Sequence, residues 1–129
     1  MVFYQPEQTT LYSTINNIAE YRCGGTSGAI GKAISSPSQW ITHTTVCAPG
    51  NNQQTNNSAG LNILPAGVRD KNGGNFLNMG YVTWLWTSSF TYDMSGLVAR
   101  QYNLHYADAG LYNYTASPAH GLSVRCIKN

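Results

Sequence analysis

The amino-acid sequence predicts an α+β domain in which helices come first and antiparallel strands follow. Near the N-terminus, Leu11, Ile15 and Ile18 recur at the three-to-four spacing of a helix with one buried face. After a polar loop at residues 49–58, aromatic and β-branched runs replace this spacing and favour strands. Helices in one half of a chain and strands in the other are typical of the α+β class.

Two helices are expected in the first part of the chain. The first spans residues 7–22, because Pro6 suits the first turn of a helix and the glycine pair at 24–25 supplies a stop. The second is short, lies around residues 28–34, and ends before Pro37. Both helices would bury their isoleucines in one core.

Three strands are expected in the later part. Residues 81–86 are aromatic and β-branched, as in a core strand. Residues 102–106 and 110–114 form a hairpin that turns at 107–109. The segment 90–93 has no burial pattern and is interpreted as an exposed aromatic loop.

The chain is expected to close with a strand over residues 122–127. Apolar and polar residues alternate there, which would direct Leu122, Val124 and Cys126 inward. Trp40 is assigned to the core, because aromatic residues dominate protein interiors.

Size and composition limit the chain to one domain, residues 1–129, with a helical half at about 6–40 and a strand and loop half at about 60–129. Lys and Arg number 7, Asp and Glu number 5, and charged residues make up only 9% of the chain. A protein that binds nucleic acid through phosphates needs a denser basic patch. No nucleic-acid partner is therefore expected.

The chain shows no feature of membrane insertion. No run approaches the roughly 20 apolar residues of a membrane span. The N-terminus lacks the charged segment followed by an apolar one that marks a signal peptide. The surface must be covered by Asn, Ser, Thr, Gly and Tyr, which suits a protein on a virion surface or a bacterial cell surface.

The cysteines and histidines do not form a recognisable metal motif. Cys23, Cys47 and Cys126 are too few for a disulfide scaffold and leave one cysteine unpaired. There is no CxxC, and His43 with Cys47 is an isolated pair of potential ligands. We expect no metal and no cofactor.

Catalysis is not expected either. The five acidic residues are Glu7, Glu20, Asp70, Asp93 and Asp108. The two glutamates lie nearly four helical turns apart, too far to act together. The chain also lacks G-x-S-x-G, H-E-x-x-H and a phosphate-binding loop.

A calcium-dependent lectin is not expected either. Asp93 and Asp108 are too isolated to form the oxygen cage of such a lectin.

Four motifs give the chain a family resemblance. They are NNSAGLNILPAGVRD, the G-x-F at 74–76, LWTSS at 85–89 and the terminal GLSVRCIKN. Together they resemble the Fibrobacter succinogenes major paralogous domain, over about residues 6–129. This family is known as a branch of the formylglycine-generating-enzyme type of C-type lectin fold.

The resemblance implies a C-type-lectin-like fold, with N-terminal helices followed by twisted antiparallel sheets and long loops. It implies too that Trp86 lies in the core, because Trp86 occupies the family's fold-building position. It also implies a disulfide to Cys126, for which Cys23 or Cys47 would be the partner, because the family's usual cysteine segment before the first helix is missing. Formylglycine-generating enzymes use two closely spaced cysteines near the C-terminus. This chain has only Cys126 there, so the resemblance does not extend to that catalysis.

In this fold family, diversity-generating retroelements mutate adenines in the C-terminal half. The family pattern resembles x-L-x-Y-x-x-A-x-V-x, in which the x positions are exposed. Residues 103–112 of this chain follow the pattern, with buried positions at Leu104, Tyr106, Ala109 and Leu111. The x positions hold Asn, His, Ala, Asp, Gly and Tyr, all reachable from an Asn codon by changing adenines. The resemblance therefore implies a diversified surface.

The same surface is rich in residues that suit binding. Tyr and Trp give a large contact area at a low cost in conformational entropy, and both carry a polar group. The candidate ligand-binding and variable positions are Val82, Trp84, Phe90, Tyr92, Asp93, Asn103, His105, Ala107, Asp108, Gly110, Tyr112 and Tyr114.

We expect a non-enzymatic ligand-binding or receptor-binding module of a phage or bacterium. Its partner would be a protein or glycan receptor on a cell surface, and the module could act as an oligomer. The alternative is a fixed bacterial adhesin or a structural module of a larger surface protein, binding glycans without calcium.

Overall fold

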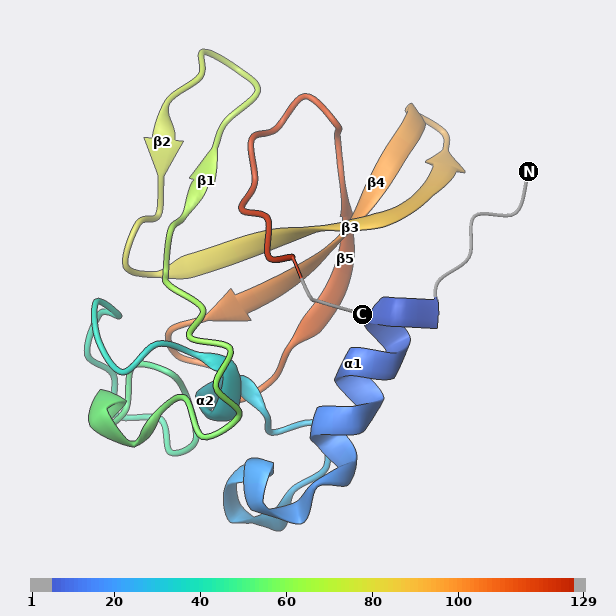
Figure 1. Ribbon diagram of the computed structural model, residues 1–129. Helices are drawn as coiled ribbons and strands as arrows, with labels where there is room; N and C mark the ends of the chain where they lie inside the picture. The colour runs from blue at the N-terminus through green and yellow to red at the C-terminus, as the bar shows by residue number, and fades with distance from the viewer. Residues whose placement is uncertain (1–5, 127–129) are drawn as a thin grey trace.

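The computed structural model of the chain describes residues 6–126 and has the expected α+β class, with helices first and antiparallel strands after them (Figure 1). The helices are α1 (Pro6–Asn17) and α2 (Gly31–Ile34), with 3₁₀ turns at Ala19–Tyr21, Cys23–Gly25 and Gln53–Thr55. The strands are β1 (Val68–Arg69), β2 (Phe76–Leu77), β3 (Val82–Asp93), β4 (Gly96–His105) and β5 (Tyr112–Ala116).

The strands form two separate antiparallel sheets. β4 lies in the centre of the larger sheet and pairs with β3 on one side and β5 on the other. β1 and β2 form a two-stranded hairpin that projects beside this sheet (Figure 1). The expected hairpin of residues 102–106 and 110–114 is thus confirmed as the β4–β5 pair.

The core lies between the helices and one face of the larger sheet. Its buried cluster consists of Ile15, Ile30, Ile34, Trp40, Ile63 and Leu104. Ile30, Ile34 and Leu104 are almost fully buried, and each contributes on the order of 2 kcal/mol through its lost contact with water. The assignment of Trp40 to the core is confirmed.

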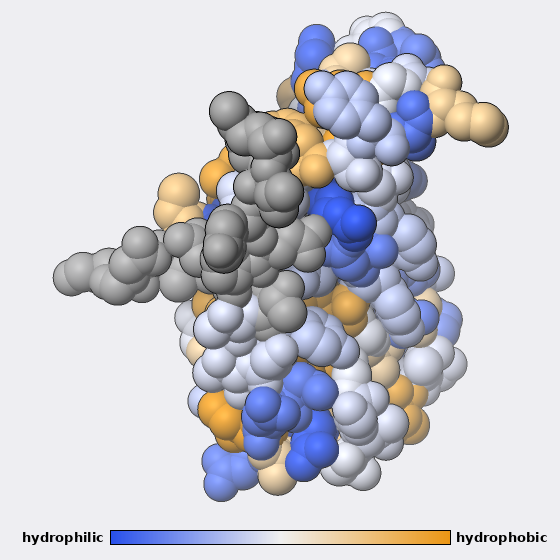
Figure 2. All heavy atoms as spheres, turned by 90° about the vertical axis from the view of Figure 1, so that its right-hand side faces the viewer, coloured by the Kyte–Doolittle hydropathy of each residue, from blue (hydrophilic) through white to orange (hydrophobic). Residues whose placement is uncertain are grey.

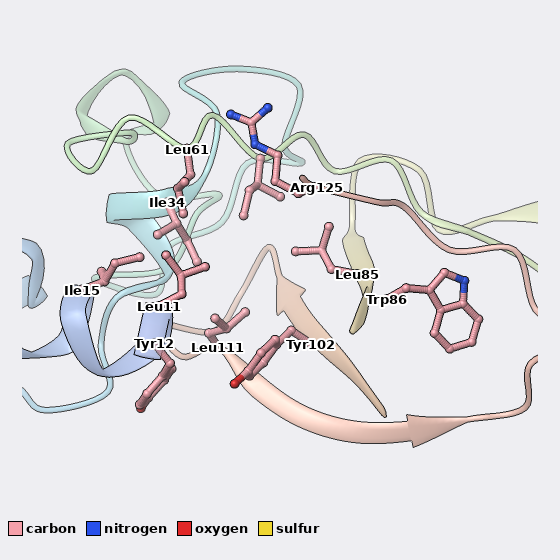
Figure 3. Close-up of a pocket in the computed structure, with 11 residues that line it drawn as sticks. Leu11, Tyr12, Ile15, Ile34, Leu61, Leu85, Trp86, Tyr102, Leu111 and Arg125 are labelled. Atoms are coloured by element: carbon pink, nitrogen blue, oxygen red, sulfur yellow. The ribbon is translucent and has the colours of Figure 1, made fainter. Parts of the chain in front are cut away.

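A cavity of about 80 Å³ remains where α1 meets the sheet. Figure 3 shows Leu11 and Ile15 of α1 and Leu85 of β3 around this space, and the ring of Trp86 turned away from it. Trp86 is only partly buried and does not belong to the buried cluster. The assignment of Trp86 to the core was therefore wrong.

The outer surface follows the expected composition. Figure 2 looks at the molecule from the side on which α1 lies in Figure 1. On the visible part of that side, hydrophobic residues reach the surface in separate small patches among hydrophilic and near-neutral residues. Single exposed apolar groups of this kind are normal for a folded domain.

Both helices are shorter than their sequence patterns predict. α1 ends at Asn17, and Ile18, with extended φ and ψ angles, is 39% exposed. The cause is Asn16, whose Oδ1 accepts a hydrogen bond from the Gly28 N–H at 2.7 Å. Its Nδ2 donates to Ser27 Oγ at 3.2 Å, so Asn16 binds the returning loop just where the helix ends.

Residues 90–93 are part of β3, so their interpretation as a loop was wrong. They pair with residues 96–99 of β4, and Asp93 Oδ1 accepts hydrogen bonds from Ser95 N and Oγ, which closes the turn. These two bonds lower the pKa of Asp93. The register shifts between Trp86 and Phe90, so three residues of β3 face one residue of β4.

The closing segment is not a continuous strand. It makes two isolated bridges, Arg69 with Gly121 and Leu85 with Ser123. Val124 is 70% exposed and Cys126 is also exposed, so the inward direction expected for both was wrong. The expected Ile127 end of the strand lies outside the described residues.

The disulfide joins Cys23 to Cys47, across 24 residues, and Cys126 is free within the described part of the chain. The pairing of Cys126 with either cysteine, implied by the family resemblance, was therefore wrong. The bond ties the loop after α1 to the long loop that follows α2. Between residues 6 and 126, no helix is long and apolar enough to cross a membrane.

Candidate binding surface

One face of the larger sheet carries a row of aromatic side chains. Trp84 lies opposite Asn103, which in turn lies opposite Tyr112, and Phe90 lies opposite Ala99. Directly opposed residues of antiparallel strands share a face, and alternate residues of β4 do as well. The register therefore places six aromatic residues on one face, here called the aromatic face: Trp84, Trp86, Phe90, Tyr92, Tyr112 and Tyr114.

The aromatic face lies opposite the face that packs on the helices, and it is exposed only in part, because Val82, Ala99 and Gln101 on it are buried. The opposite face of the sheet carries Leu104, which is fully buried, and Leu85, which packs against the buried cluster. On the aromatic face, Tyr92 is 80% exposed and Tyr114 is 53% exposed. Large, exposed and amphipathic rings are typical of protein-binding surfaces.

Neighbouring side chains restrict some of these rings. The Tyr112 and Tyr114 ring centroids lie 6.3 Å apart at a tilt of 42°. Trp84 is partly buried, and its ring meets His120 edge-on at 6.2 Å. His120 Nδ1 in turn accepts a hydrogen bond from the Lys71 N–H and lies 3.7 Å from Asp70. The closing segment thus covers one end of the aromatic face.

Two candidate positions are not exposed, and their expected exposure was wrong. Val82 is 7% exposed, and its carbonyl accepts a hydrogen bond from Gly67, which precedes β1. Gly110 is buried beneath the ring of Tyr112. A Cβ atom at Gly110 would lie 2.6 Å from Cζ of Tyr112, so only glycine allows this ring position.

The turn at residues 106–111 is anchored by backbone hydrogen bonds to distant parts of the chain. Gly50 N donates to the Tyr106 carbonyl at 2.8 Å, and Gly31 N donates to the Ala109 carbonyl at 2.7 Å. Tyr106 N donates to the Tyr81 carbonyl at 2.8 Å. A Cβ at Gly31 would lie 2.8 Å from the Ala109 oxygen, so these close approaches require glycine.

Side chains add local order within this turn. Asp108 Oδ1 accepts hydrogen bonds from Gly110 N at 3.0 Å and from the Tyr112 hydroxyl at 2.8 Å. The second bond, together with burial and the negative charge of Asp108, raises the pKa of Tyr112. His105 Nδ1 accepts from Ala107 N at 3.3 Å. The turn therefore presents ordered side chains before any partner binds.

The structure separates Asp93 from the other candidates. Asp93 faces Gly96 at the start of β4, whereas Ala107 and Asp108 follow the end of β4. A strand of ten residues spans roughly 30 Å, so Asp93 and Asp108 lie at opposite ends of the sheet. The remaining candidates on the strands, Asn103 and His105 included, lie on the aromatic face.

Sequence reasoning missed a second group of rings at the end of the sheet. Tyr106 contacts His43 edge-on at 5.1 Å, Tyr81 edge-on at 5.2 Å and His105 at 4.7 Å. His43 lies in the long loop between α2 and β1, and nothing in the local pattern links it to β4. The sequence contained no signal that could have found this contact.

The described residues do not form a metal centre. Within residues 6–126, no three His, Cys, Asp or Glu side chains come close enough together to hold a metal ion. The chemistry available at the surface is aromatic contact, hydrogen bonding by hydroxyl and amide groups, and the charge of Asp108. This combination suits recognition of a partner.

We expect Gly50→Ala to loosen the turn at residues 106–111. The added Cβ would clash with the carbonyls of Ile41 and Tyr106, which should destabilise the fold by about 1–3 kcal/mol. Urea unfolding would measure the loss, and amide exchange would locate it in the turn. Gln54→Ala, at an exposed position of the same loop, is the control. Unchanged exchange in the turn of Gly50→Ala would contradict the anchoring role.

We expect Asp108→Ala to bring the pKa of Tyr112 down toward its ordinary value. The contact keeps the hydroxyl neutral, so it stabilises the fold below a pH of about 10 and loses this effect as pH rises through the raised pKa. A pH titration of the Tyr112 ring carbons by NMR would measure the change. Asp93→Ala should leave the pKa of Tyr112 unaffected. An unaltered Tyr112 pKa in Asp108→Ala would show that the contact with Asp108 does not cause the shift.

The comparisons with known proteins identify the family. The family model of the Fibrobacter succinogenes major domain matches residues 8–128, nearly the whole chain. Comparison with curated proteins gave no match, and comparison with solved structures gave none either. The family match agrees with the four sequence motifs described above. The protein therefore belongs to the Fibrobacter succinogenes major domain family.

Proposed function

We propose that this protein is a non-enzymatic ligand-binding module whose C-terminal half displays a variable, aromatic surface. The observation that carries the proposal is the anchoring of the turn at residues 106–111. Gly31 and Gly50 hold that turn through backbone atoms alone. Because these bonds do not involve side chains of the turn, its exposed residues can be exchanged without loss of the anchors.

The scaffold proposed for this surface is a C-type-lectin-like fold. Membership of the family supports it, as do the α+β class, the two small antiparallel sheets and the long loops between α2 and β3. In such a scaffold, loops and strand ends carry binding residues on a rigid frame.

Two positions of the pattern support diversification by a retroelement, because the constant Leu104 is buried and the variable Tyr112 is 43% exposed. The constant positions 106, 109 and 111 and the variable positions 103, 105, 107 and 108 are all half-buried, so exposure does not distinguish them. The buried Gly110 is the one variable position of the pattern that faces inward.

The size of the aromatic face favours a protein receptor. Tyr92 lies opposite Leu97 and Tyr112 lies opposite Asn103, so the two tyrosines are separated by six residues of β4. At the usual strand rise this is roughly 20 Å, the scale of a protein–protein contact. The receptor would lie on a cell surface, and the module on a virion or on a bacterial cell.

The second candidate function is a fixed adhesin that binds glycans without calcium. Tyr81 favours it, because it is 44% exposed and an exposed aromatic ring can stack on a sugar. Its ring packs edge-on against Tyr106, which also contacts the half-buried His43 and His105. In the structure, both His43 and His105 accept a backbone hydrogen bond at Nδ1. Each neutral ring then has its proton at Nε2, where it can donate to a hydroxyl.

Diversification is tested by the DNA around the gene. We expect a near-copy of the last third of the coding region, beside a reverse transcriptase gene, that differs only where one copy has adenine. The differing codons should include those of Asn103, Asp108 and Tyr112. If the locus contains no such repeat, the proposal of a diversified surface is rejected, and the fixed adhesin is the remaining proposal.

Binding is tested on the aromatic face itself. We expect the double variant Tyr92→Ala with Tyr114→Ala to lose at least about tenfold in affinity for the bacterial cells that the native protein binds, because exposed tyrosines often dominate such contacts. Flow cytometry with a fluorescent fusion would measure binding across a panel of bacterial strains. Phe76→Ala, at an equally exposed aromatic residue of the other hairpin, is the matched control. Native-like binding by the double variant would show that this face is not the binding site.

A further inference from the structure

A groove of about 310 Å³ borders the turn at residues 106–111. One wall comes from the helical half and includes Tyr12, Ser27 and Gly28. The other wall comes from the turn and includes Asp108 and Tyr112. The volume is at the lower end of the range for sites that hold small molecules or single side chains.

The groove is negatively charged. Asp108 is its only ionisable group besides the tyrosines, and no Lys or Arg lies among the described residues that line it. Asp108 Oδ1 accepts both hydrogen bonds, from Gly110 N and from the Tyr112 hydroxyl. Oδ2 accepts none from residues 6–126, so one carboxylate oxygen is available to a ligand.

Two tyrosines, Tyr12 and Tyr112, line the same groove as Asp108. The faces of aromatic rings attract cations electrostatically. A groove lined by a carboxylate and two tyrosines can therefore supply a charge partner and an apolar contact for the stem of a basic side chain.

Both walls are held in place before a ligand arrives. Asn16 bonds Gly28 N at 2.7 Å and Ser27 Oγ at 3.2 Å, which fixes the first wall. The Tyr112 hydroxyl is fixed by Asp108, and the backbone of the turn by Gly31. Such preorganisation lowers the entropy lost on binding.

We infer that this groove binds an organic cation, the guanidinium of an arginine or the ammonium of a lysine presented by a protein partner. The inference rests on the proposed function and extends it, because it names the chemistry of the partner. Asp108 is a candidate variable residue, so preference for a cation would belong to this variant of the surface.

The test uses capped amino acids as probes. N-acetyl-L-arginine methylamide and its lysine counterpart are titrated into the ¹⁵N-labelled protein, and the amide signals of Gly28 and Gly110 are followed by NMR. We expect saturable shifts of both signals with at least one probe, with a dissociation constant in the millimolar range. The two probes distinguish a guanidinium from an ammonium source. N-acetyl-L-citrulline methylamide, which has the shape of the arginine probe but no charge, should give no saturable shift.

Two variants complete the test. Asp108→Asn keeps an oxygen for Gly110 N and Tyr112 and removes the charge, so we expect the cation to bind at least about tenfold more weakly. Glu20→Gln, at an exposed carboxylate outside the groove lining, should bind as the native protein does. Saturable binding of the citrulline probe, native-like binding by Asp108→Asn, or no binding of either cation would each overturn the inference.

The readout needs no receptor, so it is independent of the cell-binding test of the proposed function. If the Tyr92 and Tyr114 double variant loses cell binding and neither cation probe binds the groove, the aromatic face is supported as the binding site and the cation site is rejected. If a cation probe binds the groove and the double variant binds cells as the native protein does, the cation site is supported and the aromatic face is rejected.

Discussion

The hydrogen bonds from Gly31 and Gly50 to the turn at residues 106–111 are the constraint on which the rest of the surface depends. They join the helical half to the sheet at the end where β4 passes into β5. Glycine is needed at both positions, because a Cβ would meet the backbone of the turn. Since the anchors are main-chain atoms, they set the position of the turn and do not depend on the identity of its outward side chains.

The two ends of the larger sheet differ in how they are supported. The β4–β5 turn is held against the core, where Leu104 is fully buried. The β3–β4 hairpin extends away from the body (Figure 1) and is closed mainly by its own ladder and by the bonds from Ser95 to Asp93. Projecting hairpins of this kind open more readily than buried strands. The aromatic face therefore joins a rigid end, near Tyr112, to a more adaptable end, near Tyr92.

The sequence predicted the elements that bury one face and failed where burial was absent. Apolar spacing located α1, and β-branched and aromatic runs located the first half of β3. The spacing also included Ile18, but Asn16 bonds a loop that lies ten or more residues further on and ends the helix first. Residues 90–93 lacked a period of two because none of these four residues is buried. Residues of distant segments that come to line one groove, such as Tyr12 and Asp108, leave no mark on either local pattern.

The groove beside the turn shows how geometry and specificity can be separated in one site. Its position depends on residues outside the candidate variable set, Asn16 and Gly31, whose contacts do not change when the turn residues are exchanged. Its charge depends on Asp108 alone among the described lining residues. Asp108→Asn would keep an oxygen for Gly110 N and the Tyr112 hydroxyl and would remove the preference for a cation. A surface built in this way can change the chemistry of its partner by one substitution, at little cost to the fold that displays it.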